Sequence, residues 1–431
     1  MTDLPPLLLL DGATGTELTR RGIDTHGPAW SAPAITRAPD VLAAIHEEHA
    51  RAGADVITAN TFRTQRRALS RIGQARRARE WTFEAVRIAR EAAARVTEEL
   101  GGDRRIRVAG SIAPLEDSYS PDLAPDEATA RREHHEHAGH LAEAGVDVLL
   151  VETMTTIAEA SAATAAAAST GLETWSSVTT DRSGARLLSG EPLEGWVEAV
   201  ARFRPAALLV NCIAPGTARS AVTLLAPLAH QVGALPGAYA NLGSSEPIPG
   251  GGFDIALQPD AYAEAAKGLL DAGARILGGC CGTTPEHTRA LRTLLDERMA
   301  AESKAVQEAE AGWRMLVARA GAMAGGGRAL VVGNVDAALL PNHELIRPKP
   351  DELARLPEGR FRLAVVEGDP GILRSVATAL EPGGWLVARS RALDGLLRAA
   401  DGAAELQLEG FEIHEIASAA GSTAILARRS V

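Results

Sequence analysis

The stretch Ala274-Arg-Ile-Leu-Gly-Gly-Cys-Cys-Gly-Thr-Thr-Pro-Glu-His287 decides how this chain is interpreted. It begins as a short apolar strand, continues into two adjacent cysteines flanked by glycines, and ends at the start of a helix. Thr284 suits the N-cap of that helix, and Pro285 suits its first position, where a backbone N–H is not needed. The stretch therefore predicts a strand, a tight cysteine-bearing turn and a helix.

All three cysteines of the chain follow predicted strands. Cys280 and Cys281 belong to the stretch above, and Cys212 ends the apolar run Leu208-Leu-Val-Asn-Cys212. Because a disulfide between adjacent cysteines strains the backbone, three thiols from two strand ends favour a soft divalent metal. Zinc with three protein ligands and one open position is typical of a catalytic site. The alternative is three buried structural cysteines, but the flanking glycines allow a turn that faces both sulfurs to one point.

Short apolar runs alternate with helix-like stretches through the first two thirds of the chain. The stretches between the runs have apolar residues at helical spacing. Strand–helix alternation repeated eight times is typical of an α/β protein of the (β/α)8 TIM barrel type, and its strands are continuously apolar, as these runs are. An open doubly wound sheet is the alternative, but eight consecutive repeats favour closure. The runs are 7–10, 56–59, 106–109, 146–151, 175–178, 207–210, 237–240 and 275–277.

Polar residues able to do chemistry follow these runs directly. In a parallel barrel the carboxyl ends of all strands lie at one rim, where barrel enzymes build their sites. The sequence therefore predicts a single site that gathers residues from the whole first part of the chain. The residues concerned are Asp11, Gly12, Asn60, Thr61, Ser111, Glu152, Thr153, Thr179, Asn211, Cys212, Asn241, Cys280 and Cys281.

Three of these motifs together resemble the zinc-dependent homocysteine S-methyltransferase family. They are Asp11-Gly-Ala-Thr-Gly15, Asn211-Cys212 and Gly278-Gly-Cys-Cys-Gly282, within a match that covers roughly residues 5–295. The resemblance implies a barrel that holds Zn²⁺ through Cys212, Cys280 and Cys281. It also implies transfer of a methyl group to the thiolate of homocysteine, which gives methionine.

The resemblance further implies residues that hold the amino acid part of homocysteine. Asp11 and Glu152 would bind its ammonium group. Asp-Gly is also a common turn pair, so Asp11 could serve the turn alone, whereas a carboxylate directly after an apolar run is costly to bury without a cation. The other substrate residues are Gly12 and Ala13 through backbone N–H groups, Asn60 and Thr61 of the family's Asn-Thr-Phe motif, and Asn241. Asn241 and Asn211 are expected to orient the loops.

The expected methyl donor is a sulfonium, S-methylmethionine or S-adenosylmethionine. The family uses these, betaine or methylcobalamin, and the chain has no Asp-x-His-x-x-Gly cobalamin motif. Betaine users have a tyrosine where this chain has Arg63, whose guanidinium would repel a quaternary ammonium but could bind a carboxylate. Trp30 is a candidate cation–π partner for a sulfonium.

The sequence pattern divides into a barrel at 1–298, a helical linker at 299–327 and a second module at 328–431. The module resembles the second half of a class I S-adenosylmethionine-dependent methyltransferase, in which Pro-Gly-Gly precedes a strand, as Pro382-Gly-Gly384 does here. Only Gly333 stands where that family has its Gly-x-Gly loop, so we expect a truncated Rossmann-like α/β module that binds no cofactor. Its expected elements are strands at 329–333, 361–367 and 385–388, a helix near 371–380, a turn at 381–384 and a closing strand pair at 410–414 and 423–428.

Composition disfavours several partners. Lys and Arg number 44 against 55 Asp and Glu, and the net charge of −11 disfavours nucleic acid. The chain shows no stretch long and apolar enough for a membrane span. Three cysteines suit a reducing compartment, so we expect a cytoplasmic protein that takes small-molecule substrates, with homo-oligomerisation open.

Two other interpretations remain open, and one motif is set aside. The chain could methylate another small thiol or selenol, or be a non-catalytic zinc-binding barrel that acts as a partner subunit. Glu133-His-His-Glu-His-Ala-Gly-His140 looks like a metal cluster. It precedes the fourth predicted strand, so we expect a solvated, partly packed face of an outer helix, away from the carboxyl rim.

Overall fold

The computed structural model describes residues 7–102, 104–243, 257–333, 335–349, 352, 359–367, 376, 379–390, 411–419 and 422–429. They form two compact units, one within Asp3–Glu297 and one within Arg298–Val431. The boundary falls inside one continuous helix, α11 (Pro285–Ala324), which covers most of the segment that the sequence pattern assigns to a linker.

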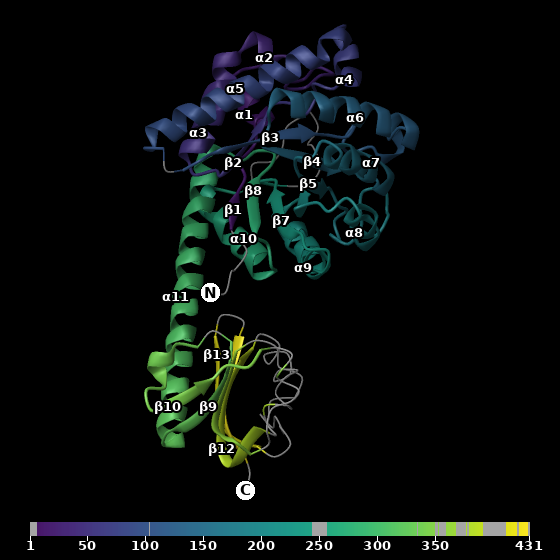
Figure 1. Cartoon of the computed structure of the whole chain (residues 1–431). Helices are drawn as coiled ribbons and strands as arrows, with labels where there is room; N and C mark the ends of the chain where they lie inside the picture. The colour runs from purple at the N-terminus through teal and green to yellow at the C-terminus, as the bar shows by residue number, and fades with distance from the viewer. Residues whose placement is uncertain are drawn as a thin grey trace. The chain divides into compact units, whose positions relative to one another are not determined.

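Eight parallel strands form the barrel of the first unit (Figure 1). Each strand pairs with the next one along the chain, and β1 closes the circle by pairing with β8 and bridging to β2 through Leu10 and Val56. The predicted TIM barrel is therefore confirmed, and the open sheet is wrong. The strands are β1 (Leu8–Leu9), β2 (Val56–Ala59), β3 (Arg107–Ile112), β4 (Val148–Met154), β5 (Glu173–Val178), β6 (Ala207–Asn211), β7 (Leu235–Ala240) and β8 (Ile276–Gly279).

Helices follow the strands and cover the outside of the barrel (Figure 1). They form because their apolar residues recur at helical spacing; α5, for example, buries Trp81, Val86 and Ala89 on one face. Among the described residues, no helix combines the length and apolar character that crossing a membrane requires. The helices are α1 (Gly15–Arg20), α2 (Ala34–Arg37), α3 (Pro39–Arg51), α4 (Arg66–Ser70), α5 (Ala78–Glu99), α6 (Glu127–Ala144), α7 (Ile157–Ala168), α8 (Leu193–Ala201), α9 (Pro215–Gln231) and α10 (Pro259–Asp271).

The barrel has two apolar layers that share its strands. Residues such as Leu150 and Leu209 fill the interior of the barrel, whereas their neighbours Leu149 and Val210 pack outward against the helices. Successive side chains of a strand point to opposite faces. A polar residue that continues the inward series at the carboxyl end, such as Glu152, therefore faces the rim of the barrel.

The face of α6 predicted to be solvated and partly packed is packed at two of its histidines, whereas His135 is exposed. His134 and His137 are 0 % and 3 % exposed rather than solvated. The Nε2 atom of His134 lies 3.2 Å from Glu159 Oε1 on α7, and Nε2 of His137 lies 3.3 Å from the backbone oxygen of Ser111. Because these rings occupy the barrel-facing side of the helix, they are packing residues that support the end of β3.

The second unit contains a six-stranded sheet in the order β10-β9-β11-β12-β14-β13. The pairs among β10, β9, β11 and β12 are parallel, and β14 is antiparallel to both β12 and β13, so the expected closing pair is present. The expected helix near 371–380 lies mostly outside the described residues. The strands are β9 (Gly327–Val332), β10 (His343–Ile346), β11 (Phe361–Glu367), β12 (Leu380–Ser390), β13 (Phe411–Ala419) and β14 (Ser422–Arg429).

One turn predicted for this unit lies inside a strand. β12 runs through 381–384, where its register against β11 shifts and Gly383 has φ 79°. Glycine adopts this left-handed conformation at little cost, so the segment forms an irregularity within the strand and does not end it. One face of the sheet packs against Trp313, Leu316 and Val317 of α11.

Candidate active site

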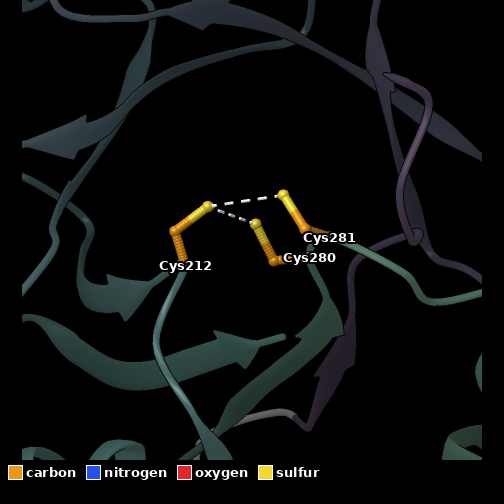
Figure 2. Close-up of side chains that lie close together, drawn as sticks. All are labelled: Cys212, Cys280 and Cys281. Atoms are coloured by element: carbon orange, nitrogen blue, oxygen red, sulfur yellow. Dashed lines mark hydrogen bonds between the residues drawn. The ribbon is translucent and has the colours of Figure 1, made fainter. Parts of the chain in front are cut away.

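Three thiols converge at the carboxyl ends of β6 and β8 (Figure 2). The Sγ atom of Cys212 lies 2.8 Å from that of Cys280 and 3.9 Å from that of Cys281. All three sulfur atoms lie within 4.8 Å of one another, and none is in a disulfide. The structure thus brings together the three cysteines that the sequence singles out.

Backbone conformation turns Cys212 toward its partners. Continued strand alternation would point it outward, as Val210 points, but Cys212 has φ 57°, in the left-handed region that few residues other than glycine adopt. On the other side, the N–H of Cys281 donates to Asn241 Oδ1 at 3.1 Å, and Gly282 turns the chain with φ 86°. Strained backbone of this kind concentrates at functional sites.

The donor set fits a soft divalent cation such as zinc, for which thiolates are preferred ligands. Within the described part of the chain, the three sulfurs form the one such cluster, and no histidine or carboxylate joins it. A fourth position is thereby left to the cavity, as in catalytic zinc sites. Hydrogen bonds from Cys280 and Cys281 lower the pKa of Cys212 well below the usual thiol value, and the same hydrogen bonds to Cys212 raise the pKa of Cys280 and Cys281 well above it. Without a cation, Cys212 is therefore the thiol of the cluster that favours the thiolate.

A cavity of about 460 Å³ adjoins the thiols at the carboxyl rim of the barrel. Strand ends contribute its acidic and sulfur-bearing wall, with Asp11, Glu152 and the cysteines. Loops contribute a wall that is mainly aromatic and basic, with Trp30, Phe62 and Arg63, although Asp117 also lines it. The cavity therefore offers two chemically different surfaces, and its volume suits small-molecule substrates.

Asp11 is buried in this cavity, with 4 % of its surface exposed. Its carboxylate accepts hydrogen bonds from the N–H of Thr58 at 2.7 Å and from Thr58 Oγ1 at 2.9 Å. Burial is nevertheless the larger effect and raises the pKa of Asp11 to about 7. A cation bound beside it would restore the charged form.

Glu152 is the second buried carboxylate, 8 % exposed. It accepts hydrogen bonds from the hydroxyls of Ser111 and Tyr239, the latter at 3.2 Å. Burial raises its pKa to about 7, and the nearby charges of Cys212 and, to a smaller extent, Asp11 contribute to the rise. Among the ion pairs of the described residues, none involves either carboxylate, so this wall of the cavity can accept a cationic group.

Comparison with known proteins agrees with this geometry. Residues 8–295 match the homocysteine S-methyltransferase family. The chain belongs to this family. The matched part contains all eight barrel strands, the three cysteines and both buried carboxylates.

Individual relatives support the assignment. The homocysteine S-methyltransferase of Escherichia coli is 30 % identical over 310 residues, which are 68 % of this chain and 96 % of the relative. The methionine synthase of Mycobacterium tuberculosis is 32 % identical over 296 residues, 65 % of this chain, but the chain spans only 24 % of that protein. The metallated form of the homocysteine methyltransferase MmuM from Escherichia coli is 28 % identical, with a TM-score of 0.59 over 68 % of this chain and 97 % of that one. The chain is thus an enzyme of the methyltransferase class, and a relative binds metal.

In this family member, the loop after β1 lines the cavity but uses one predicted donor elsewhere. Gly12 and Ala13 both lie in the cavity wall. The N–H of Ala13 donates to Thr283 Oγ1 at 3.1 Å, and that hydroxyl donates to the carbonyl of Cys280 at 2.7 Å. The N–H of Ala13, which the sequence assigns to a substrate carboxylate, therefore already has a partner that links this loop to the cysteine turn.

The predicted substrate residues Asn60, Thr61 and Asn241 make different contacts in the structure. Asn60 lines the cavity, but its amide holds Ser31, accepting from Oγ at 2.6 Å and donating to the carbonyl at 2.9 Å. Thr61 is buried away from the cavity wall and exchanges hydrogen bonds with the backbone of Ser111. Asn241 accepts a hydrogen bond from the N–H of Cys281 in the cysteine turn. These three side chains therefore shape the loops that surround the cavity.

Sequence reasoning names Ser111 but misses three further hydroxyl groups of this methyltransferase site, those of Thr58, Tyr239 and Tyr119. Thr58 donates to Asp11, Ser111 and Tyr239 donate to Glu152, and Tyr119 lines the same cavity as Cys212. Thr58, Ser111 and Tyr239 continue the inward-facing series of their strands. A polar side chain at an inward position of an otherwise apolar strand is the signal that could have found them.

The two carboxylates predict how stability depends on pH. Both pKa values are raised to about 7 from 3.8 and 4.5, so the folded protein binds more protons than the unfolded chain near neutrality. The free energy of unfolding that they contribute is present at low pH and is lost as the pH rises through 7. Relative to an Asp11→Asn/Glu152→Gln double variant, the metal-free parent should lose about 1.5 kcal/mol between pH 6.5 and 8.

Urea unfolding at several pH values measures this difference. The double variant is the matched control, because it keeps every other titratable group of the parent. A difference that stays constant from pH 6.5 to 8, or that grows in favour of the parent, would contradict the raised pKa values.

Proposed function

We propose that this protein catalyses zinc-dependent transfer of a methyl group from a sulfonium donor, S-methylmethionine or S-adenosylmethionine, to the thiolate of homocysteine, forming methionine. One observation supports it above all. Three convergent thiols share a cavity with two buried carboxylates that take part in no ion pair among the described residues. A small molecule that carries a metal-binding sulfur and an ammonium group would match both the thiols and the carboxylates. Free thiols suit a reducing compartment such as the cytoplasm.

The acceptor would be held at both ends. Its ammonium group would bind between Asp11 and Glu152, which it would keep ionised, and its sulfur would lie toward Cys212, Cys280 and Cys281. Zinc, when bound by these thiolates, would lower the pKa of the acceptor thiol and make it a thiolate at neutral pH. The hydroxyls of Thr58, Ser111 and Tyr239 would keep both carboxylates oriented.

The donor would lie against the loop wall of the cavity. Trp30 and Phe62 form an edge-to-face pair with ring centroids 5.3 Å apart, and aromatic faces attract a sulfonium through cation–π interaction. Arg63 donates to the carbonyl of Pro114 at 2.8 Å, and burial lowers its pKa to about 10. A carboxylate on the donor would stabilise the charged guanidinium of Arg63. S-methylmethionine and S-adenosylmethionine both carry such a carboxylate.

The reaction balances without any further reagent. The acceptor thiol gives its proton to solvent, and a lone pair of its sulfur forms the new S–CH₃ bond. The S–CH₃ bond of the donor breaks, and its electron pair stays on the donor sulfur. The donor therefore leaves as a neutral thioether.

Methyl transfer by zinc-loaded protein tests the proposal directly. Homocysteine is offered with S-methylmethionine, S-adenosylmethionine or betaine in separate reactions, and methionine is detected by mass. We expect turnover with a sulfonium and none with betaine. No product from any donor, in protein shown to hold zinc, would contradict the proposal and favour another thiol or a selenol as acceptor.

Arg63→Leu is expected to weaken binding of the donor while leaving the acceptor unaffected. Loss of a charge-assisted hydrogen bond to the donor carboxylate should raise KM for S-methylmethionine about 10- to 100-fold. Dimethylethylsulfonium, which lacks a carboxylate, is the control donor, and its KM should change little. An equal change for both donors would show that Arg63 shapes the loop and does not bind the carboxylate.

A further inference from the structure

Asn211 links the strand ends that carry the acidic and the thiol groups. It is fully buried at the end of β6, where it continues the inward series of Ala207 and Leu209. Its Oδ1 accepts hydrogen bonds from the N–H of Thr153 at 3.0 Å and from Ser177 Oγ at 2.7 Å, and its Nδ2 donates to Thr153 Oγ1 at 2.8 Å. One side chain therefore ties together β4, β5 and β6.

Strained backbone lies on both sides of this link. Thr153 directly follows Glu152 and has φ 60°; Cys212 directly follows Asn211 and has φ 57°. A β-branched residue in the left-handed region is a genuine outlier, and such conformations persist only where surrounding contacts hold them. The register between β4 and β5 also shifts after Val151, an irregularity of the kind that re-aims side chains beside active sites.

We propose that Asn211 is a positioning residue that fixes the separation between the Glu152 carboxylate and the Cys212 sulfur, and thereby selects acceptors by chain length. This inference rests on the proposed function. A small amino thiol has a fixed distance between its ammonium nitrogen and its sulfur, so it can use both groups only if their separation matches. Homocysteine and cysteine differ by one methylene group, and a rigid pair of strand ends discriminates between them.

Asn211 influences Glu152 through the next residue, Thr153. Two of the three hydrogen bonds of the Asn211 amide go to Thr153, one to its N–H and one to its hydroxyl. Holding both groups fixes the left-handed turn, and the turn fixes the direction of the preceding residue. Cys212 is fixed from the other side, because it adjoins Asn211 in the chain and its N–H donates to the carbonyl of Tyr239 at 3.3 Å.

Asn211→Ala in the full-length protein tests this role. We expect the dissociation constant of homocysteine, measured by titration calorimetry on zinc-loaded protein, to rise about 10- to 100-fold. The preference for homocysteine over cysteine should fall toward unity. In Co²⁺-loaded protein, the sulfur-to-cobalt charge-transfer absorption should weaken or shift, because Cys212 no longer keeps one orientation.

Matched variants separate positioning from a merely structural contribution. Ser177→Ala removes one bond to Asn211 but none to Thr153, and it should change the homocysteine preference less than threefold. Thr153→Val removes the hydroxyl partner of Asn211 while keeping the residue's shape, and it tests the same link if Asn211→Ala does not fold. Asn211→Ala/Thr153→Gly should recover part of the preference, because glycine adopts a positive φ without support.

Two outcomes would overturn the inference. One is an Asn211→Ala protein whose homocysteine preference and cobalt spectrum equal those of the parent. The other is a loss of thermal stability alone, equal in Asn211→Ala and Ser177→Ala. If the parent itself binds no homocysteine, the proposed function fails, and the role of Asn211 is then tested separately by the rate at which Cys212 is alkylated in metal-free protein. The inference requires this rate to be severalfold higher in Asn211→Ala than in the parent. Equal rates would refute it.

Discussion

Replacing Cys281 with serine is expected to remove the metal and nearly all activity while leaving the barrel folded. Cys281 lies at the mouth of the barrel, outside its two apolar layers, and serine has nearly the same shape, so unfolding should be little affected. A hydroxyl is a poor ligand for zinc compared with a thiolate. Loss of the metal's contribution should lower kcat/KM on the order of a thousandfold.

Metal content, thermal unfolding and turnover are measured on the same preparation. Thr284→Ala is the matched control, because this residue lies in the same loop and its hydroxyl bonds Glu286 at 2.7 Å, outside the cavity. The control should keep its metal. A Cys281→Ser protein that turns over normally without metal would eliminate the thiol cluster as a metal site.

Replacing Glu152 with glutamine is expected to abolish tight binding of the acceptor without changing the metal content. The substitution keeps the side chain's size but removes the charge that would pair with an ammonium group. A charge-assisted hydrogen bond contributes about 1.5–3 kcal/mol, so the dissociation constant of homocysteine should rise about 10- to 100-fold. Calorimetric titration of the zinc-loaded protein measures this change.

Two controls make the result specific to the ammonium group. The first is 4-mercaptobutanoate, which resembles homocysteine without its amine; its binding should be the same in parent and variant. The second is Glu159→Gln, which alters a buried carboxylate that bonds His134 and the backbone of Leu115 instead of facing the cavity. Unchanged affinity for homocysteine in Glu152→Gln would assign this carboxylate a structural role.

The same carboxylate predicts that acceptor binding strengthens as the pH rises. Because the pKa of Glu152 is about 7 in the free protein, part of the population is neutral at pH 6.5 and must lose a proton to pair with an ammonium group. The observed dissociation constant should therefore fall between pH 6 and 8. This dependence should weaken in Glu152→Gln, in which the ionisation of Asp11 and of the acceptor thiol still contributes.

Local sequence patterns were sufficient to predict the barrel and the location of its site. Eight apolar runs separated by helical periodicity require a sheet covered on both faces, and residues placed after such runs gather at one rim whatever the details of packing. Cys212, Cys280, Cys281, Asp11 and Glu152 all follow runs of this kind. Their convergence was therefore predictable from their positions along the chain.

The precise partners of these groups depended on contacts between distant segments. The hydroxyls of Thr58 and Tyr239 lie within strands whose apolar neighbours hide them in the sequence, and they become partners of the carboxylates only when the barrel closes. His134 and His137 appeared solvated because a helix shows in its sequence which residues share a face, but not how deeply that face is buried.

By itself, the sequence determined the succession of strands and helices and the chemical groups available at the rim, because both follow from spacing along the chain. Only the tertiary structure decided where those groups point. Strand alternation would direct Cys212 away from the cavity, and its left-handed backbone reverses that direction. The conformation of this residue and of Thr153 is costly in isolation. At Thr153 it is held by hydrogen bonds with Asn211, which join strands that meet only in the folded barrel.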